Sequence, residues 1–301
     1  MTVERQTRRQ GAAIAEEAGL ERASRGGWRA RLRGRQALVV GCGLIAALLL
    51  VSLLAPILAP YDPTEIHPID GLKPPSAEFL LGTDNLGRDI LSRIIFAART
   101  SLLVALGSVV VAVAVGMPLG LAAGYVGGKV DSVIMRVLDA ILAFPVILLA
   151  ILVVATLGTR TINLVFTIGF VYIPYFARLV RGNVLALKER EFVEASRAIG
   201  AGHLHLVTRD IVPNILSSVI VQASLTMSLA ILIEASLSYL GLGVQEPTPA
   251  WGSMLQNSQL YLRQAPWFVL APGICIFLSV LAFNLAGDGL RDALDVAGRR
   301  R

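Results

Sequence analysis

The chain has 301 residues, 55% of them hydrophobic, and its mean hydropathy is +0.68. Only 16% of its residues are charged, whereas a typical soluble domain has about 25%, so the composition excludes an ordinary soluble protein. The net charge of +6 does not indicate nucleic-acid binding, because most of the basic residues fall in loops and tails that we expect on one side of a membrane.

Apolar segments long enough to cross a bilayer recur along the chain and predict an all-α polytopic membrane protein with six transmembrane helices. Residues 1–36 are polar and rich in arginine, which predicts a cytoplasmic tail beside the lipid headgroups; a nucleic-acid-binding arm is the alternative. Residues 37–59 form the first predicted transmembrane helix, which is longer than the apolar region of a cleavable signal peptide. Cys42 and Cys275 lie inside apolar segments, and neither a disulfide nor a metal site is indicated.

Residues 60–100 are predicted to be extracytoplasmic. Within and just beyond them, residues 81–102 predict an amphipathic helix capped by Asp84 or Asn85. Four charged side chains of this block could form an ion-pair network that fixes the helix at the membrane interface, or could contact the solute: Asp84, Arg88, Asp89 and Arg93.

Residues 101–287 contain the remaining predicted transmembrane helices, at 101–125, 131–158 with Pro145 inside it, 161–179 with Pro174 inside it, 214–240 and 267–285. Near the end of the first of these, glycines recur at four-residue steps and predict close packing against a neighbouring helix: Gly116, Gly120, Gly124 and Gly128. Lys129 follows two glycines, but Val130 stands where a phosphate-binding loop needs serine or threonine. No ATPase is therefore predicted in this chain.

Two polar residues in the 214–240 helix stand out. Gln222 must face protein or a water-filled route rather than lipid. Glu234 follows Pro213 by 21 positions, or roughly 30 Å along a helix. This distance predicts an ion pair or hydrogen bond at the outer end of the helix, and a proton-relay or solute-binding role is the alternative. Residues 234–255 predict an outer loop with Trp251 and Trp267 as interfacial anchors.

A long polar stretch, 180–212, separates two of the predicted transmembrane helices. Its residues from Glu189 to Ile199 favour a short helix, which Gly200 would end, and a second helix would then lead through Pro213 into the membrane. Most lysines and arginines fall in this stretch, in the N-terminal tail and in the C-terminal tail, 288–301. The positive-inside rule places all three on the cytoplasmic side.

This stretch resembles the EAA loop of importer-type ABC permeases. The resemblance lies in Glu194-Ala195-Ser196, then Gly200, and Pro213 thirteen positions later. Ser196 replaces an alanine of the general pattern, and Asp210 stands where that pattern has an isoleucine, with Ile211 one place on. This offset, and the blocks 81–102 and 234–255, resemble the C-type subunit of dipeptide/oligopeptide permeases.

The resemblance implies a type I ABC importer permease fold in the bacterial inner membrane, with N- and C-termini in the cytoplasm. It implies a non-catalytic subunit that pairs with a homologous B-type permease subunit, two ABC ATPase subunits and an extracytoplasmic solute-binding protein, and no nucleic acid. The chain would hold no metal or cofactor, because ATP and Mg²⁺ would bind to the ATPase subunits. The residues implied in ATPase coupling are Phe192, Val193, Glu194, Ala195, Ser196, Arg197, Ile199, Gly200 and Pro213.

Dipeptides or short oligopeptides are the solutes that the resemblance implies, and nickel, glutathione or another small solute is the alternative. A proton-coupled secondary transporter that uses Asp139 and Glu234 is a further alternative. An intramembrane enzyme would need a nucleophile and base, or a metal site, within the transmembrane helices. The three histidines lie in loops and do not provide one.

Overall fold

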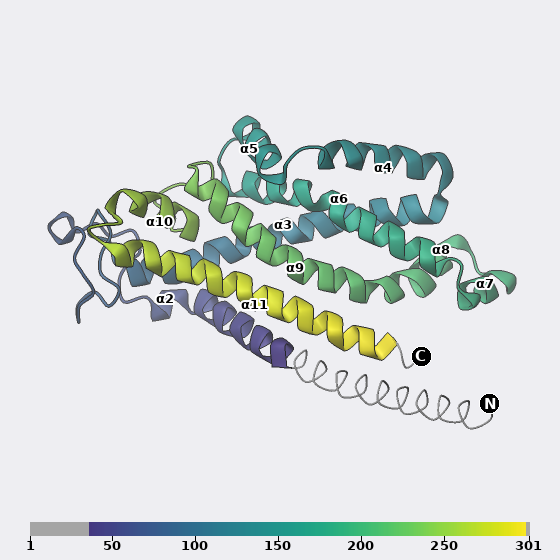
Figure 1. Ribbon diagram of the computed structural model, residues 1–301, viewed down its shortest axis with the longest axis horizontal. Helices are drawn as coiled ribbons and strands as arrows, with labels where there is room; N and C mark the ends of the chain where they lie inside the picture. The colour runs from purple at the N-terminus through teal and green to yellow at the C-terminus, as the bar shows by residue number, and fades with distance from the viewer. Residues whose placement is uncertain (1–35, 299–301) are drawn as a thin grey trace, which may run out of the picture.

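The computed structural model describes residues 36–298 of the chain, so all but the last residue of the predicted tail 1–36, and the last three residues of the chain, lie outside the described part. The described elements are helices arranged as an elongated bundle (Figure 1). In chain order they are an unlabelled helix Gln36–Leu53, α2 (Ala55–Leu58), η1 (Pro68–Asp70), α3 (Ile90–Val126), α4 (Gly128–Leu142), α5 (Val146–Leu157), α6 (Thr161–Leu187), α7 (Glu191–Ala198), α8 (His203–His205), η2 (Leu206–Ile211), α9 (Val212–Tyr239), α10 (Trp251–Ser258), η3 (Gln259–Tyr261) and α11 (Pro266–Gly298).

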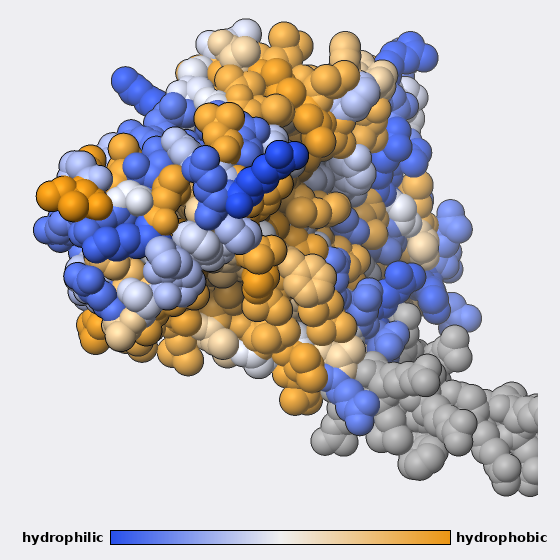
Figure 2. All heavy atoms as spheres, turned by 60° about the vertical axis from the view of Figure 1, so that its left-hand side comes forward, coloured by the Kyte–Doolittle hydropathy of each residue, from blue (hydrophilic) through white to orange (hydrophobic). Residues whose placement is uncertain are grey.

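Five helices of the described part are long and apolar enough to cross a membrane, and a sixth crossing results if α4 and α5 are taken together. Figure 1 shows α7 and α8 at one end of the bundle, and α11 runs toward that end. The segment before α3 and the helix α10 lie at the other end. Large apolar side chains are exposed along the bundle, as the wide orange areas of Figure 2 show, and such a surface suits contact with lipid. The prediction of an all-α polytopic membrane protein is confirmed.

Residues 81–102 are not the separate amphipathic helix that the sequence predicts. The helix α3 begins at Ile90 and runs for 37 residues, about 55 Å, so it contains both the predicted amphipathic segment and the second transmembrane helix. Its N-cap is Asp89, whose carboxylate accepts a hydrogen bond from the Ser92 amide at 2.8 Å. The expected caps Asp84 and Asn85 both precede this position.

The predicted third transmembrane helix, 131–158, is two helices. The axes of α4 and α5 differ by 91°, and Pro145 lies at the break, where its missing N–H and fixed φ interrupt the helix. The helix α5 has 12 residues, about 18 Å, which is shorter than the hydrocarbon core of a bilayer. Arg181 on α6 binds Asp131 of α4 through two hydrogen bonds of 2.5 and 2.6 Å.

The glycine series on α3 lies against α6. A Cβ atom at Gly116 would lie 2.7 Å from the Ile173 carbonyl oxygen, and one at Gly124 would lie 2.8 Å from the Val184 Cβ. Gly120 makes the closest approach of the three, because a Cβ atom there would overlap the Ala177 carbonyl oxygen and lie 2.8 Å from the Val180 Cβ. These three glycines bring the two helix backbones together, as small residues do in membrane proteins.

Gly128 does not belong to this packing face, although the four-residue spacing predicts that it does. Its φ is positive, at 56°, and a Cβ atom placed on it would have no described atom within 4 Å. The cause is that α3 ends at Val126 and the chain turns at Gly127, where φ is 71°. Gly128 therefore begins α4 and serves the turn, where glycine adopts a left-handed conformation at little cost.

We expect the substitution Gly120→Leu to destabilise the protein by about 3 kcal/mol or more, because its side chain would overlap the backbone of α6. Thermal unfolding of the purified protein in detergent measures the change. Gly43→Leu is the matched control, because Gly43 is exposed on the first helix and a Cβ atom there would have no described atom within 4 Å. A Gly120→Leu protein as stable as the control would contradict the packing account.

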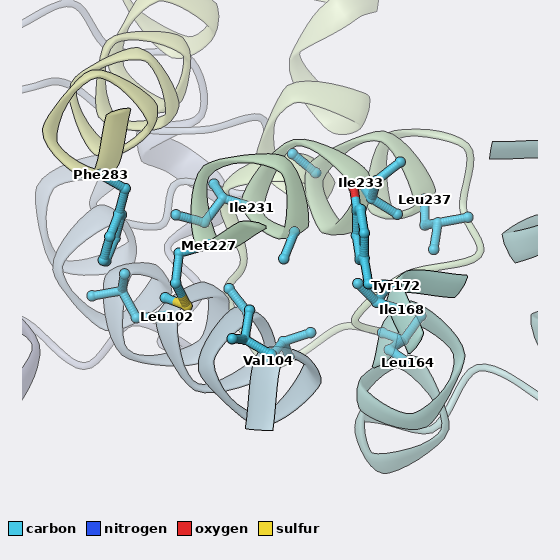
Figure 3. Close-up of a cluster of buried hydrophobic side chains, with 14 of the residues drawn as sticks. Leu102, Val104, Leu164, Ile168, Tyr172, Met227, Ile231, Ile233, Leu237 and Phe283 are labelled. Atoms are coloured by element: carbon cyan, nitrogen blue, oxygen red, sulfur yellow. The ribbon is translucent and has the colours of Figure 1, made fainter. Parts of the chain in front are cut away.

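The hydrophobic core lies between α3, α6, α9 and α11. Figure 3 shows Leu102 of α3 and Phe283 of α11 around Met227 of α9, with Tyr172 and Ile168 of α6 near the other end of the same α9 segment. The helix α11 continues to Gly298. The sequence predicts a separate C-terminal tail from residue 288, but α11 continues through this position without interruption.

Candidate functional site

The polar stretch after α6 folds into a compact projection at one end of the bundle (Figure 1). The helix α6 ends at Leu187, and α7 begins at Glu191 after a short turn. Glu191 and Glu194 lie in the first turn of α7 and Arg197 in its last. This charge order is favourable, because a helix has a positive potential at its N-terminus and a negative one at its C-terminus.

A Schellman motif ends α7. The Ala201 amide donates to the Ser196 carbonyl and the Gly200 amide to the Arg197 carbonyl, both at 3.0 Å. Gly200 occupies the left-handed position of this motif, with φ of 88°. A residue with a Cβ is disfavoured in that conformation, so glycine is what allows the chain to reverse here.

The chain then returns to the membrane through a wider helical turn. Residues Leu206–Ile211 form a π-helical turn, in which the Val212 amide donates to the Val207 carbonyl. Pro213 follows and has no N–H to donate, so the regular pattern is interrupted at this point. Both Leu206 and Ile211 are buried, and the turn packs against α7. The projection therefore joins α9 as a continuous helical segment, His203–Tyr239.

The projection is also tied to the end of α3. The Tyr125 hydroxyl and the His203 Nδ1 lie 2.7 Å apart. The Lys188 ammonium donates to the Gly124 carbonyl at 3.4 Å. Both ends of the projection therefore contact α3, which itself packs tightly on α6.

An exposed surface of mixed character covers the projection. Phe192 is 44% exposed, Ile199 87% and Leu204 77%. We call the set of exposed residues the α7 surface: Phe192, Glu194, Ala195, Arg197, Ile199, Gly200 and Leu204. Phe192, Ala195 and Ile199 are spaced to lie on one face of a helix. Exposed apolar groups at the end of the bundle, beside charged ones, are typical of a protein interface.

Two residues differ from the expected arrangement. Val193 is fully buried, because the helix turns it toward the bundle, so it anchors α7 and cannot add apolar area to a partner. Leu204 is not among the predicted coupling residues although it is largely exposed. Leu204 follows Gly200 and Gly202 and begins a predicted helix, and nothing in this sequence context indicates that its side chain is exposed. Ser196 is half-buried.

Charged residues just before α3 and in its first turn form a cluster at the opposite end, and Asp89, the N-cap of α3, makes none of its ion pairs. The Arg88 Nε lies 2.6 Å from an Asp84 oxygen and its Nη1 lies 2.7 Å from a Glu246 oxygen. The Arg93 Nη2 lies 2.9 Å from the other Glu246 oxygen, and its Nη1 donates to the Pro63 carbonyl at 3.0 Å. Asp84, Arg88 and Arg93 are buried, so the cluster is an ion-pair network.

Glu246 completes this network, and no sequence pattern singles it out. It lies on the loop after α9, more than 150 positions from Arg93, and it also accepts a hydrogen bond from Asn257 at 2.9 Å. Only a long-range contact identifies it. Trp251 follows on α10 and is buried, with its indole N–H donating to the Ile94 carbonyl at 3.3 Å. The sequence predicts an interfacial anchor at Trp251, but this side chain packs into the core.

The lowered pKa of Glu246 predicts that the stability of the folded protein depends on pH. Burial raises the pKa of this carboxyl, but Arg93 and Arg88 outweigh burial and hold it below its ordinary value of 4.5. A carboxylate with a lowered pKa stabilises the folded state above its ordinary pKa, and this stabilisation is lost as pH falls through the folded-state value.

We therefore expect the thermal stability of the wild-type protein to fall below pH 4.5 more steeply than that of Glu246→Gln. Melting curves in detergent between about pH 7 and about pH 3.5, a range that spans the ordinary carboxyl pKa, measure the difference. Glu65→Gln on an exposed surface is the control. Parallel curves for all three proteins would show that Glu246 does not contribute to acid sensitivity.

Glu234 and Gln222 lie apart from both sites. Glu234 is fully buried near the end of α9 and accepts a hydrogen bond from Ser238 at 2.8 Å, and its second oxygen has no partner among the described residues. It thus forms the expected hydrogen bond, inside the protein. Gln222 lies in the middle of α9 and lines a cavity. Asp139 contacts Arg178 of α6 and is largely exposed.

Comparisons with known proteins agree on one family. Residues 116–299 match the model of the binding-protein-dependent transport system inner membrane component, and residues 25–75 match the N-terminal transmembrane domain of oligopeptide transport permease C. The chain is 50% identical over 261 residues to the di/tripeptide transport system permease protein DppC of Pseudomonas aeruginosa, with 84% of this chain and 86% of the relative covered.

Two further relatives and one solved structure extend the likeness. The dipeptide transport system permease protein DppC of Alkalihalophilus pseudofirmus is 46% identical, with 88% of this chain and 87% of the relative covered. The glutathione transport system permease protein GsiD of Pectobacterium atrosepticum is 46% identical, with 89% of each chain covered. An inward-facing MetNI methionine ABC transporter has a chain with a similar fold, at a TM-score of 0.55 and 18% identity, over 65% of this chain and 93% of that one.

Proposed function

This chain belongs to the binding-protein-dependent transport system inner membrane components, and from this premise we propose that it is the C-type permease subunit of an importer for dipeptides or short oligopeptides. It is a multi-pass bacterial inner-membrane protein and a permease of the ABC importer class. Two DppC relatives support a peptide solute. A second candidate, glutathione, is supported by the GsiD relatives at 46% and 44% identity.

In this proposal the α7 surface is the contact with an ATPase subunit. Glu194, Ala195 and Gly200 form its centre, Phe192 and Ile199 with Leu204 add apolar area, and Arg197 makes an ion pair at the rim. Ser196 and Pro213 hold the shape of the projection through the Schellman motif and the turn into α9. The single observation that carries the assignment is the exposed apolar surface on a compact projection at one end of the bundle.

In this mechanism the chain transmits a rigid-body motion from the ATPase subunits to the membrane, and the chemical reaction takes place in those subunits. Two ATPase subunits would bind ATP and Mg²⁺, close on each other and move the α7 surface. The continuous segment from His203 through α9, and the ties from the projection to α3, would carry that motion into the membrane. A homologous B-type subunit would form the other half of the path, and a solute-binding protein would deliver the peptide from outside.

This proposal is tested by measuring which energy source drives solute uptake. Radiolabelled dialanine uptake by cells that express the whole transporter should stop when ATP is depleted, and should persist when a protonophore collapses the proton gradient while ATP is maintained. The opposite pattern would support a proton-coupled secondary transporter that uses Asp139 and Glu234. Competition by glutathione against dialanine then ranks the two solutes.

A further inference from the structure

A cavity opens between α6, α9 and α11, toward the end of the bundle that carries α7. Its volume is about 400 Å³, within the range of roughly 300–1,000 Å³ that small-molecule sites occupy. Three polar side chains of α9 line it, Ser217, Ser218 and Gln222, and α11 contributes Arg291. Leu179 of α6 and Leu294 of α11 add apolar groups to its wall.

The cavity lies next to the part of the bundle where α9 and α11 are in close contact. Farther from α7 the two helices are in close contact: Ser224 donates to the Phe283 carbonyl at 3.1 Å, and Ser228 donates to the Asn284 side chain at 3.0 Å. A Cβ at Gly287 would lie 2.8 Å from Leu225. About one helical turn beyond Gly287, Arg291 and Leu294 of α11 line the cavity together with the polar residues of α9. Among the described residues, Ser217, Ser218 and Gln222 make no side-chain hydrogen bond to α11, and the Gln222 amide donates to Thr226 within α9 at 3.3 Å.

The charge of the cavity selects the kind of group that it can bind. Arg291 is its cation, and no carboxylate is among the described residues that line it. Serine hydroxyls and the Gln222 amide can donate hydrogen bonds to an anion, and a guanidinium binds a carboxylate through two parallel hydrogen bonds. Polar and charged side chains within transmembrane segments mark solute pathways more often than lipid contacts.

We propose that this cavity binds the carboxylate of the transported peptide on the α7 side of the membrane, with Arg291 as the main contact and Ser217, Ser218 and Gln222 as hydrogen-bond donors. The inference rests on the proposed import of peptides. It adds a solute contact in the permease itself, where the free carboxylate end of the peptide distinguishes it from a neutral analogue.

Uptake of two labelled probes by the whole transporter tests the site: dialanine and its C-terminal amide. The binding protein is the same in every strain, so a change in the acid-to-amide uptake ratio reports on the permease alone. We expect Arg291→Gln to lower the ratio about tenfold, the effect of losing one charge-assisted hydrogen-bonded contact, and Arg291→Lys to recover part of it. Arg136→Gln is the matched control, because Arg136 is an exposed arginine on α4 and should leave the ratio unchanged.

Each other outcome counts against the site. An unchanged ratio in Arg291→Gln, with wild-type amounts of assembled transporter and wild-type ATP hydrolysis, would overturn it. An equal loss for both probes that varies with the anionic phospholipid content of proteoliposomes would assign Arg291 to lipid headgroups instead. If the wild-type transporter imports neither probe, peptide import itself fails, and this inference fails with it.

Discussion

The substitution Gly200→Val is expected to reduce transport to background while the protein is still inserted in the membrane. Gly200 has φ of 88°, and a β-branched residue in that region carries a strain of about 1–3 kcal/mol. The turn would relax by abandoning the Schellman motif, which moves Ile199 and Leu204 relative to each other. Because the α7 surface needs both residues in place, coupling to the ATPase would be lost.

Dialanine uptake by cells measures the effect, and an immunoblot of the membrane fraction reports insertion. Gly182→Val is the matched control: Gly182 lies on α6, its φ is outside the positive range, and a Cβ atom there would have no described atom within 4 Å. Normal uptake in Gly200→Val would refute the role assigned to the bend, whereas equal loss of both proteins from the membrane would show a folding defect instead.

The second large effect is expected from Arg93→Met. Arg93 is fully buried and binds Glu246, which lies far away in the chain. Removing one member of a buried ion-pair network costs about 3–5 kcal/mol, because Asp84 and Glu246 would then share Arg88 as their one cation in the network. We therefore expect a large fall in melting temperature of the detergent-purified transporter, with aggregation of the subunit at growth temperature.

Lys73→Met is the matched control, since Lys73 pairs with Asp70 where both side chains are partly exposed to solvent, and we expect a loss of stability of at most about 1 kcal/mol there. The double variant Arg93→Met/Glu246→Met should be more stable than Arg93→Met alone, because it also removes the excess carboxylate and leaves the balanced Asp84–Arg88 pair. A double variant whose loss equals the sum of the two single losses would show that the two residues do not interact.

Most of the fold follows from apolar periodicity and from glycine spacing. Four-residue glycine steps place Gly116 and Gly120 on one face of a helix, and that face packs on α6. The sequence predicts the role of these glycines correctly because their shared face depends only on the spacing of residues within one helix. The same reasoning assigns Gly128 to the face, because it cannot tell that the helix ends at Val126.

Two features of the fold depend on contacts between segments that are distant in the sequence, and sequence patterns do not predict such contacts. The 91° bend between α4 and α5 requires α4 to be held against α6, and Pro145 alone allows either a kink or a full break. Glu246 is recognised only when the loop after α9 lies beside Arg88 and Arg93. In the candidate site, likewise, burial of Val193 reflects packing of α7 on the bundle and not its neighbours in sequence.

The most direct test of the account is a cross-link from the α7 surface. A cysteine at position 199, in a transporter otherwise free of reactive thiols, is joined by a bifunctional thiol reagent to whatever lies next to it, and a cysteine at the exposed Leu260 of the opposite end is the control. We predict that the product from position 199 contains a nucleotide-hydrolysing subunit and the product from position 260 does not. Labelling of position 199 by a membrane-impermeant reagent added outside intact cells, with no such subunit in the product, would contradict the account.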